Sequence, residues 1–306
     1  MPISPEHIWQ HSVHELRIND LLAMAAETLM NLPAVQRRQR LALGSLPERP
    51  YPRHVYKFRA LPARPEEREY VEQILRDNQL YAPTSDAFND PFDAQADYRV
   101  EHDAGVLREQ VESFLVAGGA SAAIAQGLSH ADVLSRPGEI AALLKAHHQE
   151  TLQQIGVYCL AANPKAPLLW AHYAHEHKGI AIQFRPSRDL RTMLLHPVHY
   201  ATTYPVIENY FDRRDRDLVS PLLRKSMSWS YEDEWRILRP GQPKQVFSIR
   251  PEALTGVLLG MRMSDADRAY VERIVRARDQ RYRLHTRLYQ AEPAAGTYDV
   301  RFRRLR

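Results

Sequence analysis

The sequence predicts an α+β protein with a mixed, largely antiparallel sheet and flanking helices. Short β-like runs dominate the chain after residue 154. Several of these runs follow one another with no helix between them, which a regular alternation of strands and helices would not give. Helical periodicity is nonetheless clear at 138–154 and 264–278, so we expect helices to flank the sheet.

The first fifty residues are expected to form a helical appendage. Ser4-Pro5-Glu6 combines a capping hydroxyl, a proline suited to the first helical position and an early acid. Leucine and alanine then recur at helical spacing until Pro33. Prolines and arginines fill residues 33–54, as in a linker. We therefore divide the chain into an N-terminal extension and linker, 1–53, and a single α+β domain, 54–306.

The domain is interpreted element by element from its periodicity. Its first strand is expected at 55–59, followed by a helix at 65–77, and residues 103–154 are expected to be mostly helical. Further strands are expected at 155–161, 179–184, 198–204, 234–238, 246–249, 256–259, 282–288 and 298–302. Further helices are expected at 138–154, 186–195, 215–226 and 264–278.

Composition narrows the class of protein. The 306 residues hold 41 Lys and Arg against 37 Asp and Glu, and 44% of them are hydrophobic, which excludes a wholly disordered, collagen-like or coiled-coil chain. A single cysteine excludes a disulfide scaffold and a cysteine-only metal cluster. No apolar run approaches the roughly 18 residues of a membrane span, and the N-terminus lacks signal-peptide order. We expect a cytoplasmic protein with no membrane partner.

Charge and motifs exclude several further functions. The basic residues are mostly arginines spread among acids, so a nucleic-acid partner is not favoured on charge alone. Only the C-terminal run Arg301–Arg306 reads as a basic patch. The sequence has no P-loop, dinucleotide-binding glycine fingerprint, Gly-x-Ser-x-Gly elbow or paired-histidine zinc motif. Cys159 lies in an apolar run and is interpreted as a buried structural thiol.

The segment Trp229–Leu238 combines acids, a base and aromatic residues. If the segment is extended, Glu232, Glu234 and Arg236 share one face, while Trp235 on the other face packs into the core. Two carboxylates two residues apart repel unless a cation or ligand lies between them, which raises one pKa. That arrangement suits a carboxylate that bonds a sugar hydroxyl or acts as a general base. The alternative is a surface ladder of ion pairs.

The segment Leu169–Gly179 contains three histidines that lie within six residues of one another. On a helix, His172 and His175 share a face with an acid one turn on, which is a spacing that zinc can use. The glycine that follows equally fits a helix end whose histidines complement the helix dipole. We favour over zinc an aromatic wall of Trp170, His172 and Tyr173 beside an organic ligand.

A turn is expected at Phe88–Asp93, where Asn and Asp precede a proline. The flanking phenylalanines would anchor that turn on the core. Its role is either purely structural or to point Asn89 or Asp90 into a cleft.

Together and in this order, the strand segment Tyr56–Arg59 and the three clusters resemble a bacterial family known only as domain of unknown function 2971 (DUF2971). The resemblance spans residues 54–290 and leaves the first fifty residues outside. Its most specific parts are Phe88–Asp93 and Trp229–Arg236; the segments Trp170–Gly179, Lys225 and Gly256–Gly260 also match. The family name supplies no activity, so the resemblance implies one shared site rather than a reaction.

A weaker similarity is to ADP-ribosyltransferase-like folds, in which an early strand carries Arg or His and a late strand carries Glu-x-Glu. In those proteins the late glutamate holds the nicotinamide ribose hydroxyl while the glycosidic bond breaks. The similarity implies Glu234 as the catalytic carboxylate, Glu232 as its partner and NAD as substrate. It also implies that Arg59 meets the NAD phosphate or ribose and that Tyr173 or Trp170 stacks on nicotinamide. The sequence departs from these proteins in lacking a clear Ser-Thr-Ser strand.

We therefore expect one cleft in the α+β domain. Its catalytic residues are expected to be Glu234 and Glu232. Its binding residues are expected to be Tyr56, Lys57, Arg59, Asn89, Asp90, Trp170, His172, Tyr173, Lys225 and Arg236. The expected function is a transferase or glycohydrolase that acts on a nucleotide such as NAD, through an oxocarbenium-like state stabilised by Glu234 and without a bound metal.

Two other functions stay open. The first is a non-enzymatic nucleotide- or nucleic-acid-binding module of a defence or toxin system, with Arg59, Lys225 and Arg236 contacting phosphate. The second is a metal-dependent phosphoesterase, whose ligands would be His172, Glu232, Glu234 and Asp90.

Overall fold

The structure is a computed structural model that describes residues 51–62, 64, 68–99, 105–109, 112, 137–207 and 219–306. The helix expected before Pro33 and most of the helical stretch expected at 103–136 lie outside the described residues. Tyr51 is buried, and its hydroxyl donates to the Met193 carbonyl at 3.1 Å and accepts from the Leu195 N–H at 2.9 Å. The described chain is therefore anchored to the core from its first residue.

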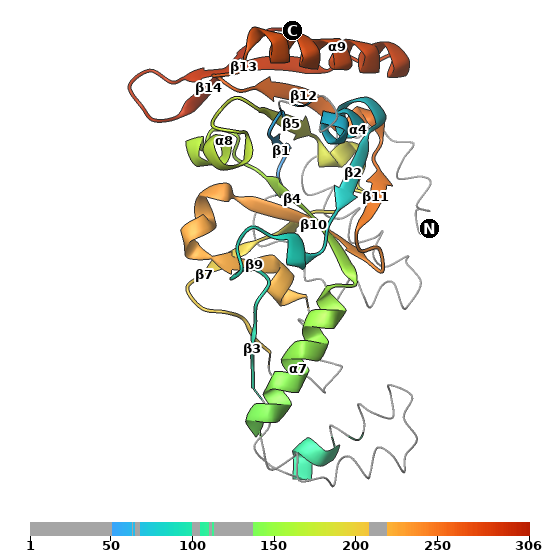
Figure 1. Cartoon of the computed structure of the whole chain (residues 1–306), viewed down its shortest axis with the longest axis vertical. Coiled ribbons are helices and arrows are strands. Elements are labelled where there is room, and N and C mark those ends of the chain that lie inside the picture. Colours follow the sequence, from blue (N-terminus) through green and yellow to red (C-terminus); the bar gives the residue numbers. More distant parts are fainter. Residues whose placement is uncertain are drawn as a thin grey trace, which may run out of the picture.

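An eight-stranded sheet forms the centre of the molecule, with strand order β14-β13-β12-β5-β1-β4-β10-β6 (Figure 1). Every neighbouring pair is antiparallel except β12 and β13, which are parallel. The predicted α+β class with a mixed, largely antiparallel sheet is thus confirmed. The strands are β1 (Val55–Arg59), β4 (Ile155–Ala161), β5 (Ile180–Phe184), β6 (His196–Pro197), β10 (Glu234–Pro240), β12 (Leu254–Leu259), β13 (Arg287–Pro293) and β14 (Val300–Arg304).

Three two-stranded ribbons accompany this sheet. They pair β2 (Gln79–Ala82) with β11 (Gln245–Ser248), β3 (Asp97–Tyr98) with β8 (Val206–Ile207), and β7 (His199–Ala201) with β9 (Arg224–Ser226). Short 3₁₀ turns connect many of the strands: η2 (Ser85–Ala87), η4 (Pro186–Arg188), η5 (Ser220–Leu223), η6 (Met227–Glu232) and η7 (Pro251–Ala253).

The helices of the described chain are α4 (Glu69–Asp77), α7 (Pro137–Leu152), α8 (Pro167–Tyr173) and α9 (Asp265–Tyr282). Helix α9 makes the crossover that parallel β12 and β13 require. Its N-terminus is capped by the Ser264 hydroxyl, which accepts from the Asp267 N–H. Helix α4 packs against α9, and the Tyr270 hydroxyl of α9 donates to Glu72 of α4 at 2.8 Å. None of the helices in the described part of the chain combines the length and apolarity that crossing a bilayer requires.

Strand β1 divides the core because its alternate side chains serve two apolar clusters. Val55 packs with residues such as Ile182 and Trp235, whereas Tyr56 and Phe58 pack with residues such as Trp170. Lys57 and Arg59 alternate with that second pair, so they share one side of the strand as predicted.

A gap opens between β1 and β4 in the middle of the sheet. Strand β1 pairs with β5 along its whole length but with β4 at Tyr56 opposite Ala161. Further along β4, the Val157 N–H donates to the Pro83 carbonyl at 2.7 Å, and the Lys57 ammonium donates to the Cys159 carbonyl at 2.9 Å. A side chain and the segment after β2 therefore occupy the edge of β4 that β1 leaves.

Two predicted helices are wrong. The segment predicted as helix 186–195 is a single 3₁₀ turn, Pro186–Arg188, because the Asp189 carboxylate accepts from the distant Arg250 N–H at 2.8 Å and holds the chain out of a helix. Within 215–226, the described residues 219–226 form η5 and then strand β9. The strand predicted at 282–288 is displaced, since α9 continues to Tyr282 and β13 begins at Arg287.

Candidate functional site

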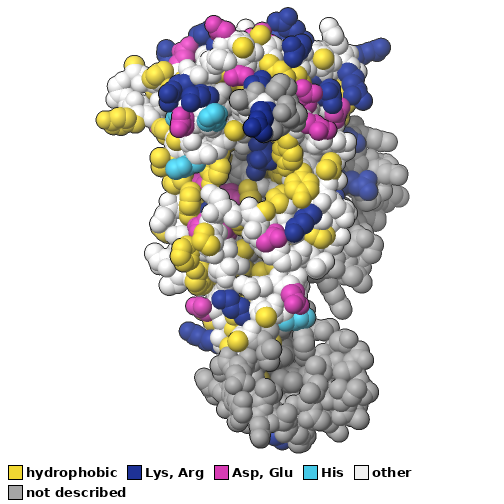
Figure 2. All heavy atoms as spheres, viewed as in Figure 1, with side chains coloured by type: hydrophobic (Ala, Val, Ile, Leu, Met, Phe, Trp, Pro, Cys, Tyr) yellow, Lys and Arg dark blue, Asp and Glu magenta, His cyan; other side chains and the backbone are white. Residues whose placement is uncertain are grey.

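A cavity of about 580 Å³ lies at the gap between β1 and β4, a volume typical of small-molecule sites. Ten of the twelve residues predicted for the site line it: Tyr56, Lys57, Arg59, Asn89, His172, Tyr173, Lys225, Glu232, Glu234 and Arg236. Its walls come from β1, β4, α4, α8, η6 and β10. Figure 2 shows a hollow in the viewed face with Lys and Arg side chains inside it, beside hydrophobic ones. Asp90 and Trp170 are not part of the lining.

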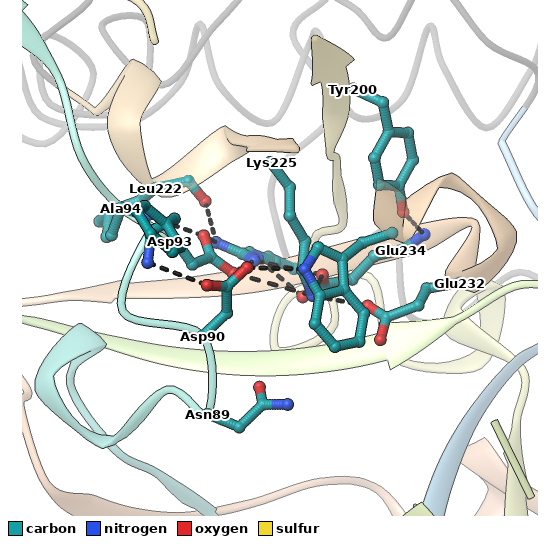
Figure 3. Close-up of polar contacts among 12 residues, drawn as sticks. Asn89, Asp90, Asp93, Ala94, Tyr200, Leu222, Lys225, Glu232 and Glu234 are labelled. Carbon is teal, nitrogen blue, oxygen red and sulfur yellow. Dashed lines mark hydrogen bonds and ion pairs between the residues drawn. The ribbon is translucent and has the colours of Figure 1, made fainter. Parts of the chain in front are cut away.

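The floor of the cavity is a buried network of charges centred on Lys225 and Arg236. The Lys225 ammonium lies 2.6 Å from Glu232, 3.0 Å from Glu234 and 3.8 Å from Asp93. The Arg236 guanidinium donates to Glu234 at 2.8 Å, to Asp93 at 2.6 Å and to the Leu222 carbonyl at 2.8 Å. Figure 3 shows Asp93, Glu232 and Glu234 gathered around the end of the Lys225 side chain. The three carboxylates thus outnumber the two cations by one.

The two predicted catalytic carboxylates differ in protonation behaviour. Burial acts against the charged form of Glu234, but Arg236 and Lys225 outweigh it and hold the pKa of Glu234 well below its usual range. Burial raises the pKa of Glu232 above its usual range; Lys225 opposes this rise, and the neighbouring Glu234 adds to it. Glu232 is therefore the carboxyl of the pair that can take up a proton nearer to neutral pH.

The sequence predicted that Glu232 and Glu234 share one face of a strand, and this prediction is wrong for Glu232. It is the last residue of η6, and Asp233 then adopts a left-handed conformation with φ of 45°. Strand β10 begins only at Glu234. Asp is one of the few residues that adopt this conformation readily, so the chain turns sharply and brings Glu232 to the cluster from a 3₁₀ turn. Glu234 and Arg236 do share a strand face.

Tyr173 and Asn89 extend the network toward the opening of the cavity. The Tyr173 hydroxyl donates to Glu232 at 2.7 Å and accepts from the Asn89 amide at 3.2 Å. Burial, followed by the charge of Glu232, raises the pKa of Tyr173. The hydroxyl therefore stays protonated and is a fixed donor to the Glu232 carboxylate.

Four rings form an aromatic rim: His172, Tyr173, Trp229 and Tyr231. The exposed His172 ring lies 6.2 Å from Tyr173, 6.3 Å from Trp229 and 6.5 Å from Tyr231, measured between ring centroids. Trp229 and Tyr231 are 6.0 Å apart. His172 and Tyr173 line the cavity, and Trp229 and Tyr231 lie next to His172 outside that lining. The rim supplies an apolar, flat contact surface for an organic ring, and it takes the place of the wall predicted from Trp170.

Trp170 itself belongs to the core. It is fully buried, its indole N–H donates to the Pro164 carbonyl at 2.8 Å, and it packs edge-on against Phe58 at 5.2 Å. The zinc interpretation needed the helix that carries Trp170 to continue through His175, but the helix ends before that residue. Helix α8 stops at Tyr173, and His175 lies beyond it with a positive φ of 47°, so His175 does not continue the helical face of His172.

The turn at 88–93 has two acids with different tasks. Asp90 caps the turn through the Phe92 N–H at 2.9 Å and accepts from the Trp229 indole N–H at 2.6 Å, so it positions the aromatic rim rather than lining the cavity. Asp93 accepts from its neighbour Ala94 at 2.8 Å and pairs with Arg236. Sequence reasoning missed Asp93 and Trp229 as members of the site, although both belong to the segments it singled out.

Lys57 and Arg59 line the opposite side of the cavity. The Lys57 ammonium lies 4.8 Å from the ring centroid of Tyr158, and the Arg59 guanidinium lies 4.8 Å from that of Tyr70. Among the described residues, neither cation forms an ion pair with a carboxylate. Burial and then the charge of Arg59 lower the pKa of Lys57 to about 8.

Two further possibilities at the cavity are a reactive cysteine and a metal site. Burial raises the pKa of the Cys159 thiol to about 12, so it stays protonated, in keeping with a structural thiol. No group of three or more potential metal ligands gathers among the described residues. Lys225 and Arg236 fill the space between the carboxylates where a metal ion would be held.

Three of the four arginines in the predicted C-terminal basic patch form ion pairs. Arg301 and Arg303 both pair with Glu292, at 3.0 and 2.6 Å, and Arg306 pairs with Asp279 at 2.7 Å.

Comparisons with protein-family models, with curated proteins and with solved structures find no match to this chain. The resemblances to DUF2971 and to ADP-ribosyltransferase-like folds therefore stay predictions.

Proposed function

We propose that the cavity binds a nucleotide and that the protein is an enzyme that cleaves or transfers a glycosidic bond in it, with NAD as the first candidate substrate. The observation that carries the proposal is the composition of one cavity. Its β1 side holds Lys57 and Arg59 without carboxylate partners among the described residues, and its floor holds Glu232 with a raised pKa. The anionic part and the reacting sugar of one bound ligand would therefore each meet a suitable side chain of the cavity.

The β1 side fits the phosphates. A guanidinium offers a planar pair of donors that matches phosphate, and Arg59 projects from β1 beside Tyr70 at 4.8 Å. The aromatic rim at the other side fits a flat heterocycle such as nicotinamide. Between them, the carboxylates would stabilise positive charge developing on the ribose.

We assign the catalytic role to Glu232 and a positioning role to Glu234. Both oxygens of Glu234 already accept hydrogen bonds from cations: Oε1 from Arg236 at 2.8 Å, and Oε2 from Lys225 at 3.0 Å. Glu232 has one oxygen on Lys225 at 2.6 Å and the other on the neutral Tyr173 hydroxyl at 2.7 Å. Glu232 is therefore the carboxyl less neutralised by cations, and its raised pKa suits proton transfer.

The test incubates the protein with NAD, with and without candidate acceptor proteins, and measures the released nicotinamide by chromatography. We expect release by the wild type and a fall of about 100-fold or more for Glu232→Gln, since a general acid–base group contributes at least that much. Glu176→Gln is the control, because Glu176 is exposed and its ion pair among the described residues is with Lys178. Absence of release by the wild type under all these conditions would overturn the enzymatic proposal, and full activity of Glu232→Gln would overturn the assignment.

The full engagement of the floor carboxylates also favours a second candidate, a non-enzymatic nucleotide-binding module. In that case Lys225 and Arg236 serve to hold the floor rigid. NAD binding without nicotinamide release, retained in Glu232→Gln and lost in Arg59→Ala, would support this module against the enzyme.

A further inference from the structure

Two lysines line the cavity, and their surroundings are opposite. Lys225 is clamped by carboxylates at 2.6 and 3.0 Å, and these charges outweigh its burial and raise its pKa. Lys57 has no carboxylate within ion-pair distance among the described residues. Its ammonium instead donates to the Cys159 carbonyl at 2.9 Å and lies over the Tyr158 ring.

The gap in the sheet explains how Lys57 reaches its position. Because β1 pairs with β4 only around Tyr56 and Ala161, the next residue of β1 can extend its side chain along the freed edge of β4. A backbone carbonyl and an aromatic face hold the amine without neutralising it. The amine is thus positioned at the cavity wall by groups that do not compete chemically with a ligand.

We propose that Lys57 is a reactive amine that forms an imine with an aldehyde or ketone carrying an anionic group. The neutral amine attacks the carbonyl carbon and forms a C–N bond. As that bond forms, the C=O π pair moves to oxygen, and a proton passes from nitrogen to this oxygen to give a hydroxyl. A second proton, from Glu232, turns the hydroxyl into water, which leaves while the nitrogen lone pair closes the C=N bond, and loss of the remaining N–H proton to Glu232 gives the imine. No oxidant or reductant is consumed.

Three features of the cavity support this chemistry. Arg59, two residues along the same strand, offers the charge that would bind the anionic group of the ligand. Glu232 faces the same space with a raised pKa and can supply the proton for loss of water. The pKa of Lys57 is lowered to about 8 by burial and Arg59, while Cys159, Glu234 and Glu232 oppose the shift. A substantial fraction of the amine is therefore neutral at mildly alkaline pH.

This inference does not depend on NAD being the substrate. Imine formation at Lys57 needs only an anionic carbonyl compound in the cavity. Nicotinamide release can therefore fail while imine formation succeeds, and the reverse also holds.

The test uses pyridoxal 5′-phosphate, an aldehyde with a phosphate group, at less than one equivalent per chain. Borohydride reduction fixes the imine as a secondary amine, and peptide mass spectrometry locates it. The chain has six lysines, at 57, 145, 165, 178, 225 and 244, so each can be scored. We expect Lys57 to be labelled first, with Lys225 as the control inside the same cavity and Lys178 and Lys244 as exposed controls.

Two variants and a second reagent sharpen the outcome. Lys57→Arg keeps the positive charge and should remove the label, while Arg59→Ala should slow labelling at Lys57 about 10-fold. Pyridoxal, which lacks the phosphate, should label the wild type as slowly as pyridoxal 5′-phosphate labels Arg59→Ala. Circular dichroism confirms that each variant is folded. Labelling spread evenly over the exposed lysines, or labelling of Lys225 ahead of Lys57, would overturn the proposal.

Discussion

The Asp93 carboxylate accepts two hydrogen bonds from the Arg236 guanidinium, at 3.1 and 2.6 Å, across 143 residues of sequence. Both side chains are buried. This bidentate pair joins the turn at 88–93 to β10, and the same guanidinium orients Glu234. One contact therefore fixes the floor of the cavity and positions the segment that holds Asn89 against Tyr173.

Replacing Arg236 should strongly destabilise the fold. Arg236→Met leaves Asp93 and Glu234 buried with fewer cations, and breaking a buried pair from one side typically costs about 3–5 kcal/mol. Urea unfolding followed by tryptophan fluorescence measures the loss. Glu176→Gln, which breaks an exposed pair with Lys178, should leave the free energy of unfolding nearly unchanged, because solvent screens that pair. Equal, small losses in both variants would contradict the structural role of the pair.

Removing the Tyr173 hydroxyl should raise the pKa of Glu232 further. The hydroxyl donates to the carboxylate at 2.7 Å and thereby favours its charged form. Tyr173→Phe deletes that donor, and a titration of ¹³C-labelled glutamate side chains by NMR should show the shift. Tyr231→Phe is the matched control on the same rim, and it should leave the titration of Glu232 nearly unchanged. A fall in the pKa of Glu232 in Tyr173→Phe would show that the hydroxyl does not donate to it.

Acid should destabilise the protein partly through His54. Burial and the charges of Arg53, Arg185, Arg287 and Arg188 lower its pKa to about 4. The unfolded chain takes up a proton near pH 6.5 and the folded chain does not, so this group removes stability as pH falls from about 6.5 toward 4. Between pH 7.5 and 5, His54→Gln should lose about 1 kcal/mol less than the wild type, because solvent screens a half-buried ring. Parallel pH profiles for the two proteins would argue against the shift.

Gly179 is required where the segment after α8 meets β1. A Cβ at Gly179 would lie 2.2 Å from the Arg59 carbonyl oxygen, a backbone atom that cannot move alone. Gly179→Ala should cost about 3 kcal/mol and weaken ligand binding, because it displaces the end of β1 that carries Arg59. Gly241→Ala has open space around the new Cβ but a positive φ of 70°, so it should cost about 1 kcal/mol of backbone strain and leave binding unchanged. Thermal unfolding and ligand titration of the two variants separate these outcomes.

Local signals were sufficient for the start of α9 but not for its end. The helix was predicted at 264–278, and it does begin after the Ser264 cap with an acidic first turn, but it continues to Tyr282 before Arg283 adopts a left-handed conformation. The strands β1, β4 and β10 could be predicted because each is a short run of residues with β-like periodicity, whose apolar side chains pack in the core. The prediction of a helix at 186–195 was wrong because two distant residues hold this segment. The Tyr51 hydroxyl donates to the Met193 carbonyl, and the Arg250 N–H donates to the Asp189 carboxylate. Those bonds override local helical preference.

The site was predictable as a set of residues but not as a geometry. The three motif segments supplied part of the cavity lining because charged and aromatic residues cluster there, and β1 and β4 supply much of the rest. The pairing of Asp93 with Arg236 was out of reach, since nothing local indicates a partner 143 residues away. The same holds for the gap in the sheet, which depends on Val157 bonding Pro83 rather than β1. The left-handed turn at Asp233 is a single-residue feature, and periodicity does not detect it.

The most direct test of the account is a calorimetric titration of the full chain with ADP-ribose, which carries phosphates and ribose but no nicotinamide. We predict saturable binding of one ligand per chain, weakened about 10-fold or more by Arg59→Ala, which corresponds to about 1.4 kcal/mol, and unchanged in the exposed-arginine control Arg303→Ala. Absence of binding, or equal binding by wild type and Arg59→Ala, would contradict the claim that this cavity is a nucleotide site.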